Sequence, residues 1–233
     1  MTIRNSCTIL LNTPNAMTHA LKSIIKAIPG VKALHVRWLG RGVKARIKLR
    51  MEGRRRALAA ISPNACCAEI GVHEGDFSAR ILQAGTVRVL NLIDPWKFFS
   101  GEDYDQSLYG GSEVGGQNGM DARCERVRKR FSSEVNSGQV VFHRMLSSEA
   151  AEHFADGSLD WVYVDGDHQY EGVMADLVDY YRKLKSGGVM AGDDYGLPGW
   201  WKNGVQVAVD EFARTHPDAT LEIIGDQFIL RKP

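Results

Sequence analysis

The sequence predicts an α/β fold with a mostly parallel seven-stranded sheet that ends in an antiparallel hairpin. From Cys66 onward, short apolar runs typical of buried strands alternate with segments of helical periodicity. In addition, a turn containing Gly71 and Gly75 joins the first apolar run to a helix that begins near Asp76. Strand, glycine turn and helix in this order are typical of a nucleotide-type cofactor site at the end of a first strand.

Residues 1–60 are predicted to form an extension before this domain. Residues 14–28 have apolar side chains at helical spacing, which predicts a helix. Residues 34–52 instead alternate apolar and mostly cationic side chains, which predicts a hairpin with one basic face. The segment 31–56 contains ten Lys or Arg and one acid, so it carries about +9 while the remainder carries about −8. It is either a platform for an anionic partner or a solvated sheet face.

Residues 61–233 are predicted to form the domain itself. Helices are expected after the glycine turn, through Val127, after Ser147 as a cap, through Val173 and over 205–214. Residues 98–120 have no periodicity, and a loop of this length predicts a functional lid or a disordered segment. The expected strands begin at Cys66 and cover 87–93, 140–145, 159–164, 189–191, 221–224 and 228–230.

The composition places the chain among globular proteins. Of its 233 residues, 44% are hydrophobic and 24% charged, and the net charge of +1 gives no general attraction to nucleic acid or membranes. The four cysteines lack metal or disulfide spacing, which favours a reducing compartment. We find no apolar run of membrane-spanning length and no signal-peptide core. We therefore expect a cytoplasmic protein, and the sequence leaves a homo-oligomer open.

Acidic residues follow four of the predicted strands. Glu69, Asp94, Asp165 and the pair Asp193–Asp194 occupy these positions. Because the carboxyl ends of parallel strands meet at one edge of a sheet, these carboxylates would repel one another unless a cation neutralised them. Asp94 lies where an acid accepts hydrogen bonds from the ribose hydroxyls of a nucleotide cofactor.

The second half of the domain predicts a metal site with a base beside it. Asp165, Asp193 and Asp194 offer hard oxygen ligands, which suit Mg²⁺ or Mn²⁺. His168 follows Asp165 by three residues and could take a proton from a substrate hydroxyl near neutral pH. A bound metal would lower the pKa of that hydroxyl.

Two sets of motifs carry a family resemblance. The pattern Glu69-x-Gly71-x-x-x-Gly75 resembles motif I of class I S-adenosylmethionine (SAM) methyltransferases. From about residue 60 to the end the chain is similar to a family of sugar and antibiotic O-methyltransferases, which includes the macrocin-type and cephalosporin-biosynthesis enzymes. The motifs that carry this similarity are Asp94-Pro95-Trp96, Asp165-Gly166-Asp167-His168-x-Tyr170, Lys185-Ser186-Gly187-Gly188 and Asp193-Asp194-Tyr195.

The resemblance implies a Rossmann-like domain that transfers a methyl group from SAM to a hydroxyl of a small-molecule or sugar acceptor. It implies metal ligation by Asp165, Asp193 and Asp194, with His168 as the catalytic base. The residues expected to bind SAM are Glu69, Gly71, His73, Gly75, Asp76, Asp94, Ser147 and Asp165.

Three alternatives remain open at this point. A nicotinamide-dependent oxidoreductase is disfavoured because the glycine spacing is not G-x-G-x-x-G. A nucleic-acid methyltransferase could use the basic segment, but Asp165-Gly166-Asp167-His168 stands where amino-group methyltransferases carry an Asn/Asp-Pro-Pro-Tyr/Phe motif. We therefore do not expect nucleic acid as a partner. A SAM-binding module without catalysis is the third.

Overall fold

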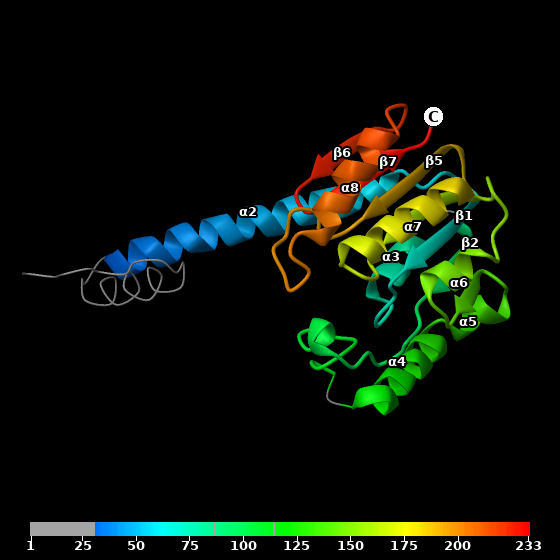
Figure 1. Cartoon of the computed structure of the whole chain (residues 1–233), viewed down its shortest axis with the longest axis horizontal. Coiled ribbons are helices and arrows are strands. Elements are labelled where there is room, and N and C mark those ends of the chain that lie inside the picture. The colour runs from blue at the N-terminus through cyan, green and yellow to red at the C-terminus, as the bar shows by residue number, and fades with distance from the viewer. Residues whose placement is uncertain (1–30, 86, 114) are drawn as a thin grey trace, which may run out of the picture. The chain divides into compact units, whose positions relative to one another are not determined.

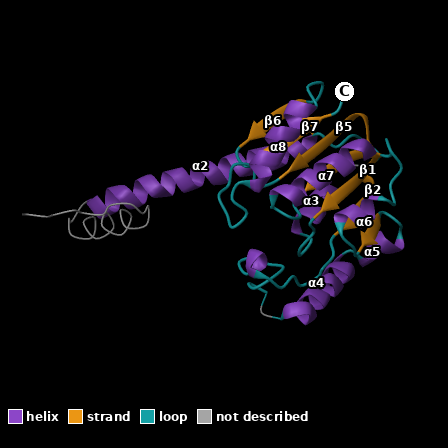
Figure 2. Ribbon diagram, in the orientation of Figure 1, coloured by secondary structure: helices purple, strands orange, loops and turns teal. Residues whose placement is uncertain are grey.

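The computed structural model describes residues 31–85, 87–113 and 115–233 (Figures 1 and 2). One compact unit runs from Leu49 to Pro233 and contains the sheet. The helix predicted over residues 14–28 lies outside the described residues. In the part of the chain that the structure describes, no helix combines the length and apolarity needed to cross a bilayer.

The sheet has seven strands in the order β3-β2-β1-β4-β5-β7-β6. β1 to β5 pair in parallel, whereas β7 runs antiparallel to β5 and β6 antiparallel to β7. The predicted mostly parallel sheet with its closing hairpin is therefore confirmed. The strands are β1 (Ala65–Ile70), β2 (Val87–Ile93), β3 (Val140–His143), β4 (Leu159–Val164), β5 (Leu184–Gly192), β6 (Thr220–Ile224) and β7 (Gln227–Arg231).

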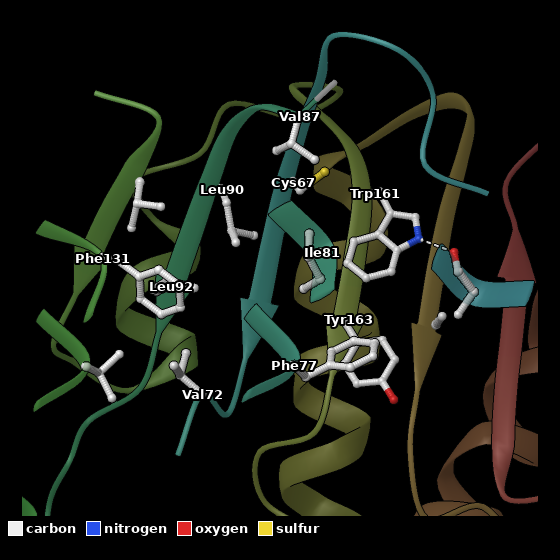
Figure 3. Close-up of a cluster of buried hydrophobic side chains, with 14 of the residues drawn as sticks. Cys67, Val72, Phe77, Ile81, Val87, Leu90, Leu92, Phe131, Trp161 and Tyr163 are labelled. Carbon is white, nitrogen blue, oxygen red and sulfur yellow. Dashed lines mark hydrogen bonds between the residues drawn. The ribbon is translucent and has the colours of Figure 1, made fainter. Parts of the chain in front are cut away.

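Helices cover both faces of the sheet. On one face, α3 (Asp76–Gln83), α4 (Gly116–Arg130) and α5 (Ser132–Asn136) pack over a core that includes Leu90, Trp161 and Tyr163 (Figure 3). On the other, α6 (Ser147–Ala151), α7 (Tyr170–Lys183) and α8 (Gly204–Thr215) cover a core with Val162 and Phe228. A short 3₁₀ helix (Glu102–Tyr104) interrupts the long loop before α4.

The register of the central strands makes their ends level. Ile70 of β1 pairs with Ile93 of β2 and with Val164 of β4. The Gly71 amide then donates to the Ile93 carbonyl at 2.9 Å, and the Asp165 amide donates to the Ile70 carbonyl at 2.8 Å. The residues that follow the three strands therefore lie side by side at one edge of the sheet.

The predicted basic hairpin over 34–52 is wrong. These residues lie in α2, a continuous helix of 29 residues from Val31 to Ala59. The alternating segment consists largely of Lys, Arg, Leu, Met and Ala, which are strong helix formers, so its period of two did not specify a strand. From Leu49 on, α2 belongs to the compact unit, while the division into 1–60 and 61–233 stays a prediction.

Gly53 lets α2 approach the β6–β7 turn. A Cβ at Gly53 would lie 2.5 Å from the Ile224 carbonyl oxygen and 2.5 Å from Cγ of Gln227. At the other side of the contact, a Cβ at Gly225 would lie 3.0 Å from the Leu49 backbone. Further along the helix, the Trp161 indole donates to the Ala57 carbonyl at 3.0 Å. These contacts bring α2 close to the end of β5.

Candidate functional site

A cavity of about 780 Å³ lies at the carboxyl ends of β1, β2 and β4. Its size suits a nucleotide-sized ligand together with a small acceptor. The cavity is lined by all of the predicted site residues except Gly75 and Asp193, and also by Arg54, Tyr109, Asp176, Trp200 and Trp201. The level strand ends thus bring most of the predicted residues together.

The glycine turn forms one wall of this cavity. Gly71 has a φ of +83°, and a Cβ there would lie 1.9 Å from the Asp165 carbonyl oxygen, so only glycine fits. Gly75 has a φ of +77° and immediately precedes α3, where a Cβ would press on Phe131. Both glycines are therefore needed for the turn to pass close to β4 and to begin the helix.

Glu69 is buried at the end of β1. Its carboxylate accepts a hydrogen bond from the Ser78 hydroxyl on α3. Burial raises the pKa of Glu69 well above its ordinary value, against the opposing effect of the Ser78 bond. Ser78 was missed by the sequence analysis, because a serine one turn into a helix carries no distinctive signal.

Asp94 accepts hydrogen bonds on both carboxylate oxygens. Oδ2 accepts from the amides of Val72 at 2.9 Å and His73 at 3.0 Å, and Oδ1 accepts from the Trp96 amide at 2.7 Å. Oδ2 also accepts from the Tyr109 hydroxyl. Burial raises the pKa of Asp94, and these bonds oppose that effect. The carboxylate thus fixes the glycine turn and faces the cavity from beneath Tyr109.

The other residues predicted to bind the cofactor differ in their surroundings. Nε2 of His73 is buried and has no hydrogen-bond partner among the described residues. Burial lowers the pKa of His73, so the ring is neutral. A nitrogen in the cavity wall without a hydrogen-bond partner among those residues is available to bond a polar ligand. Asp76 instead directs its side chain, 85% exposed, to Arg130 at 2.7 Å.

Ser147 is the first residue of α6, not its cap as predicted, because Leu146 precedes the helix in an extended conformation. The Ser147 hydroxyl bonds to Asp176, a buried carboxylate on α7. Burial raises the pKa of Asp176 to about 7, and the Ser147 bond opposes the rise. Asp176 was missed, although an acid between Val173 and Leu177 on an apolar helix face is a signal that could have found it.

At the far wall, His168 lies between two carboxylates. Its Nε2 is 2.8 Å from Asp194 Oδ2 and 3.6 Å from Asp165 Oδ1. Burial lowers the pKa of His168, but the bonds and charges of Asp165 and Asp194 outweigh it and raise the pKa to about 10. Ligand atoms of these three residues lie within 4.8 Å of one another, so this donor set fits a divalent ion.

Asp193 has a different environment from the one predicted. Its side chain is 1% exposed and pairs with Arg50 at 2.8 Å and with Arg54, both from α2. Gln227 and the Asp194 amide donate to its other oxygen. Burial alone would raise the pKa of Asp193, but the attraction of the two arginines holds it below its usual value. Two arginine side chains of the protein thus supply the positive charge at this carboxylate, where the sequence analysis expected a bound cation.

Aromatic side chains form the roof beside His168. The ring centroids of Trp201 and His168 are 4.8 Å apart, and those of Tyr104 and Trp200 are 5.6 Å apart. The Tyr104 hydroxyl also donates to Asp167 at 3.2 Å. Tyr104 comes from the aperiodic loop that was predicted to be a lid or a disordered segment, whereas the tryptophans come from the segment after β5 and were missed.

Comparisons with known proteins agree with this geometry. A family model described as "Methyltransferase domain" matches residues 68–195. No curated protein matches the chain. Among solved structures, the O-methyltransferase NovP is 22% identical, with 79% of each chain covered and a TM-score of 0.59.

Two further structures share the fold. A protein of Streptococcus mutans in complex with S-adenosylhomocysteine (SAH) is 11% identical, with 78% of this chain and 97% of that chain covered and a TM-score of 0.54. An rRNA methylase from Streptococcus thermophilus is 11% identical, with 76% of this chain and 93% of that chain covered and a TM-score of 0.51. The family model covers more than half of the chain, from β1 to the end of β5. With its seven-stranded sheet and glycine turn, the chain belongs to the class I SAM-dependent methyltransferases.

Proposed function

We propose that the protein transfers the methyl group of SAM to a hydroxyl oxygen of a small-molecule or sugar acceptor, assisted by a divalent metal. The observation that carries this proposal is the position of His168, which lies in the same cavity as the glycine turn and within reach of two carboxylates. The O-methyltransferase NovP, which shares the fold, supports the choice of an oxygen acceptor. The family match to methyltransferases gives no support to a nicotinamide oxidoreductase.

SAM would lie along the glycine turn. SAM supplies an electrophilic methyl group on its sulfonium, and the chain has to hold that group in line with the acceptor oxygen. In this proposal, Asp94 accepts the ribose hydroxyls, and Gly71 and Gly75 let the backbone approach the cofactor. The unpartnered Nε2 of His73 and the hydroxyl of Ser147 are further polar groups that line the cavity.

For the metal we propose Asp165 and Asp194 as ligands. A divalent ion there would act as a Lewis acid on the acceptor hydroxyl. Asp193 is left out of this set because its oxygens already accept bonds from two arginines, a glutamine and a backbone amide. His168 is the proposed base. It can accept a proton only as a neutral imidazole. Because Asp165 and Asp194 raise the pKa of His168, this requires that a bound metal ion neutralise part of their negative charge and so lower that pKa.

Calorimetry and turnover test the proposal. We expect SAH to bind and NAD not to bind, and Asp94→Ala to weaken SAH binding by about 1–3 kcal/mol. Methyl transfer from labelled SAM to a panel of hydroxyl compounds should stop in excess chelator and return with Mg²⁺ or Mn²⁺. His168→Ala should lower turnover by about 10²–10⁴-fold without changing SAH affinity. His153→Ala, an exposed histidine outside the cavity, is the matched control.

The components of the proposal can fail separately. Binding of NAD without SAH would overturn the cofactor. Full turnover in chelator would remove the metal, and an unchanged rate in His168→Ala would remove the base. Methylation of RNA, with no product from the hydroxyl panel, would replace the proposed acceptor by nucleic acid.

A further inference from the structure

The loop before α4 places a tyrosine hydroxyl on the carboxylate that is proposed to bind the cofactor ribose. Tyr109 donates to Oδ2 of Asp94, and Asp94 has no exposed surface. Three of the four donors to this carboxylate are backbone amides of residues 72, 73 and 96. The phenol is the remaining donor and comes from a different segment of the chain, so its departure leaves three donors to the carboxylate.

A buried arginine holds the loop in this closed position. Arg123 of α4 is 7% exposed, lies 5.6 Å from the Tyr109 ring and donates to the Leu108 carbonyl at 3.3 Å. The same guanidinium pairs with Glu113 at the end of the loop and with Glu74 in the glycine turn at 3.1 Å. One side chain therefore ties both the loop and the cofactor turn to α4.

A phenol and a ribose hydroxyl make the same kind of bond to a carboxylate, because each is an O–H donor. Oδ2 of Asp94 already accepts from two backbone amides and from the Tyr109 hydroxyl, and Asp94 has no exposed surface. A ribose hydroxyl can thus reach this oxygen only after the tyrosine hydroxyl has left it. In the absence of cofactor, the phenol supplies the fourth donor to this buried carboxylate, which lowers the cost of burying its charge.

We propose that Tyr109 is a positioning residue whose hydroxyl occupies, on Asp94, the place of the cofactor's ribose hydroxyl. Cofactor binding then replaces the tyrosine hydroxyl by the ribose hydroxyl and opens the loop. This inference rests on the proposed cofactor role of Asp94. It predicts that the Tyr109 hydroxyl competes with the cofactor, whereas a residue that contacts the bound cofactor would strengthen binding.

The sign of one substitution decides between these roles. Tyr109→Phe keeps the ring against Arg123 and removes only the hydroxyl, so we expect SAH to bind about three- to tenfold more tightly by calorimetry. Tyr170→Phe is the matched control. The Tyr170 hydroxyl donates to the Glu211 carboxylate at 2.9 Å, and both residues lie outside the cavity. The control should leave SAH affinity unchanged. Thermal unfolding without ligand checks that both variants fold.

A spectroscopic measurement follows the exchange itself. In protein labelled with ¹³C at the tyrosine ζ carbon, the signal that Tyr109→Phe removes should shift on addition of SAH toward the value of a solvated phenol. Unchanged or weaker SAH binding by Tyr109→Phe would overturn the inference, as would a Tyr109 signal that SAH does not move. If wild type and all variants failed to bind SAH, the proposed cofactor role itself would be overturned.

Discussion

Buried carboxylates on the two sides of the cavity have opposite kinds of partner: neutral hydrogen-bond donors on one side and cations on the other. On the glycine-turn wall, neutral donors surround buried carboxylates: the Ser78 hydroxyl bonds Glu69, and backbone amides with Tyr109 bond Asp94. On the opposite side, which we call the cationic wall, Arg54 of α2 lines the cavity and, together with Arg50, pairs with Asp193 behind it. The pKa of Glu69 and of Asp94 is raised, whereas that of Asp193 is lowered.

The difference teaches that an acid at a strand end has no fixed role. Neutral donors suit a carboxylate that later accepts hydroxyl groups, because one O–H can replace another. Permanent cations suit a carboxylate that stays ionised and holds structure together. The sign of the pKa shift separates the two cases, and it can be tested through the pH dependence of stability.

We expect the largest effect from Asp176→Asn, which removes another buried carboxylate of the cavity whose partner is a neutral hydroxyl, that of Ser147. The folded pKa of Asp176 is about 7, above its unfolded value, and Asp167 and Asp179 face it with like charge. A carboxyl with a raised pKa costs stability progressively as pH rises from its unfolded pKa of about 4 to its folded pKa of about 7. The variant should therefore be more stable than the wild type at pH 8 by up to about 4 kcal/mol.

This gain should shrink as pH falls and vanish below about pH 3, where the acid is protonated in both states. Urea unfolding of both proteins at several pH values measures the difference. A gap that stays constant from pH 4 to pH 8 would contradict the raised pKa.

On the cationic wall the expected change has the opposite sign. Arg54→Met keeps the packing of the side chain over Phe77 but leaves Asp193 with one guanidinium fewer, which should lower the free energy of unfolding by about 3 kcal/mol. Adding Asp193→Asn to this variant should restore part of the loss. Arg55→Met, on the solvent side of the same helix and paired with Glu52, is the control and should have little effect in urea unfolding.

Gly53→Ala tests whether close approach of α2 places those arginines. A methyl group at this position would meet the β6–β7 turn at 2.5 Å, and overpacking of this kind costs about 1–3 kcal/mol. Alanine also favours a helix by about 1 kcal/mol, so we expect a net loss of up to about 2 kcal/mol in thermal or urea unfolding. Gly85→Ala has no atom within 4 Å of its new methyl group and should show no such loss.

The smallest effect is expected at the solvent side of α2. Arg56 pairs with Glu222 of β6, but the two side chains are 49% and 34% exposed. Arg56→Gln should therefore change the unfolding free energy by less than about 1 kcal/mol, and salt should abolish the difference. A loss as large as that of Arg54→Met would show that exposure does not separate the two ion pairs.

Part of the site could be predicted because it depends on local sequence and on strand direction. Gly71 and Gly75 are needed by the backbone of the turn itself, so their spacing is visible in the sequence. Asp94, Asp165 and Asp194 follow parallel strands, and the carboxyl ends of such strands meet at one edge. Finding these residues around one cavity required only that the strands before them lie parallel and next to one another in the sheet.

The partners of those residues could not be predicted in the same way. Tyr109 reaches Asp94 from a loop without periodicity, and Arg50 reaches Asp193 across 143 residues of sequence. The α2 segment was even assigned to the wrong element, because the helical spacing of Arg50, Gly53, Arg54 and Ala57 acquires meaning only once the β6–β7 turn is seen to face it.

The sequence by itself thus determined the fold class, the glycine turn and the set of acids at the strand ends. Each of these follows from backbone conformation or from the alternation of strands and helices, which are properties of neighbouring residues. Only the tertiary structure decided which acids meet hydroxyl and amide donors and which meet arginines. The free energy of a buried charge depends on the donors within a few ångströms of it, and long-range packing brings those donors there from distant parts of the chain.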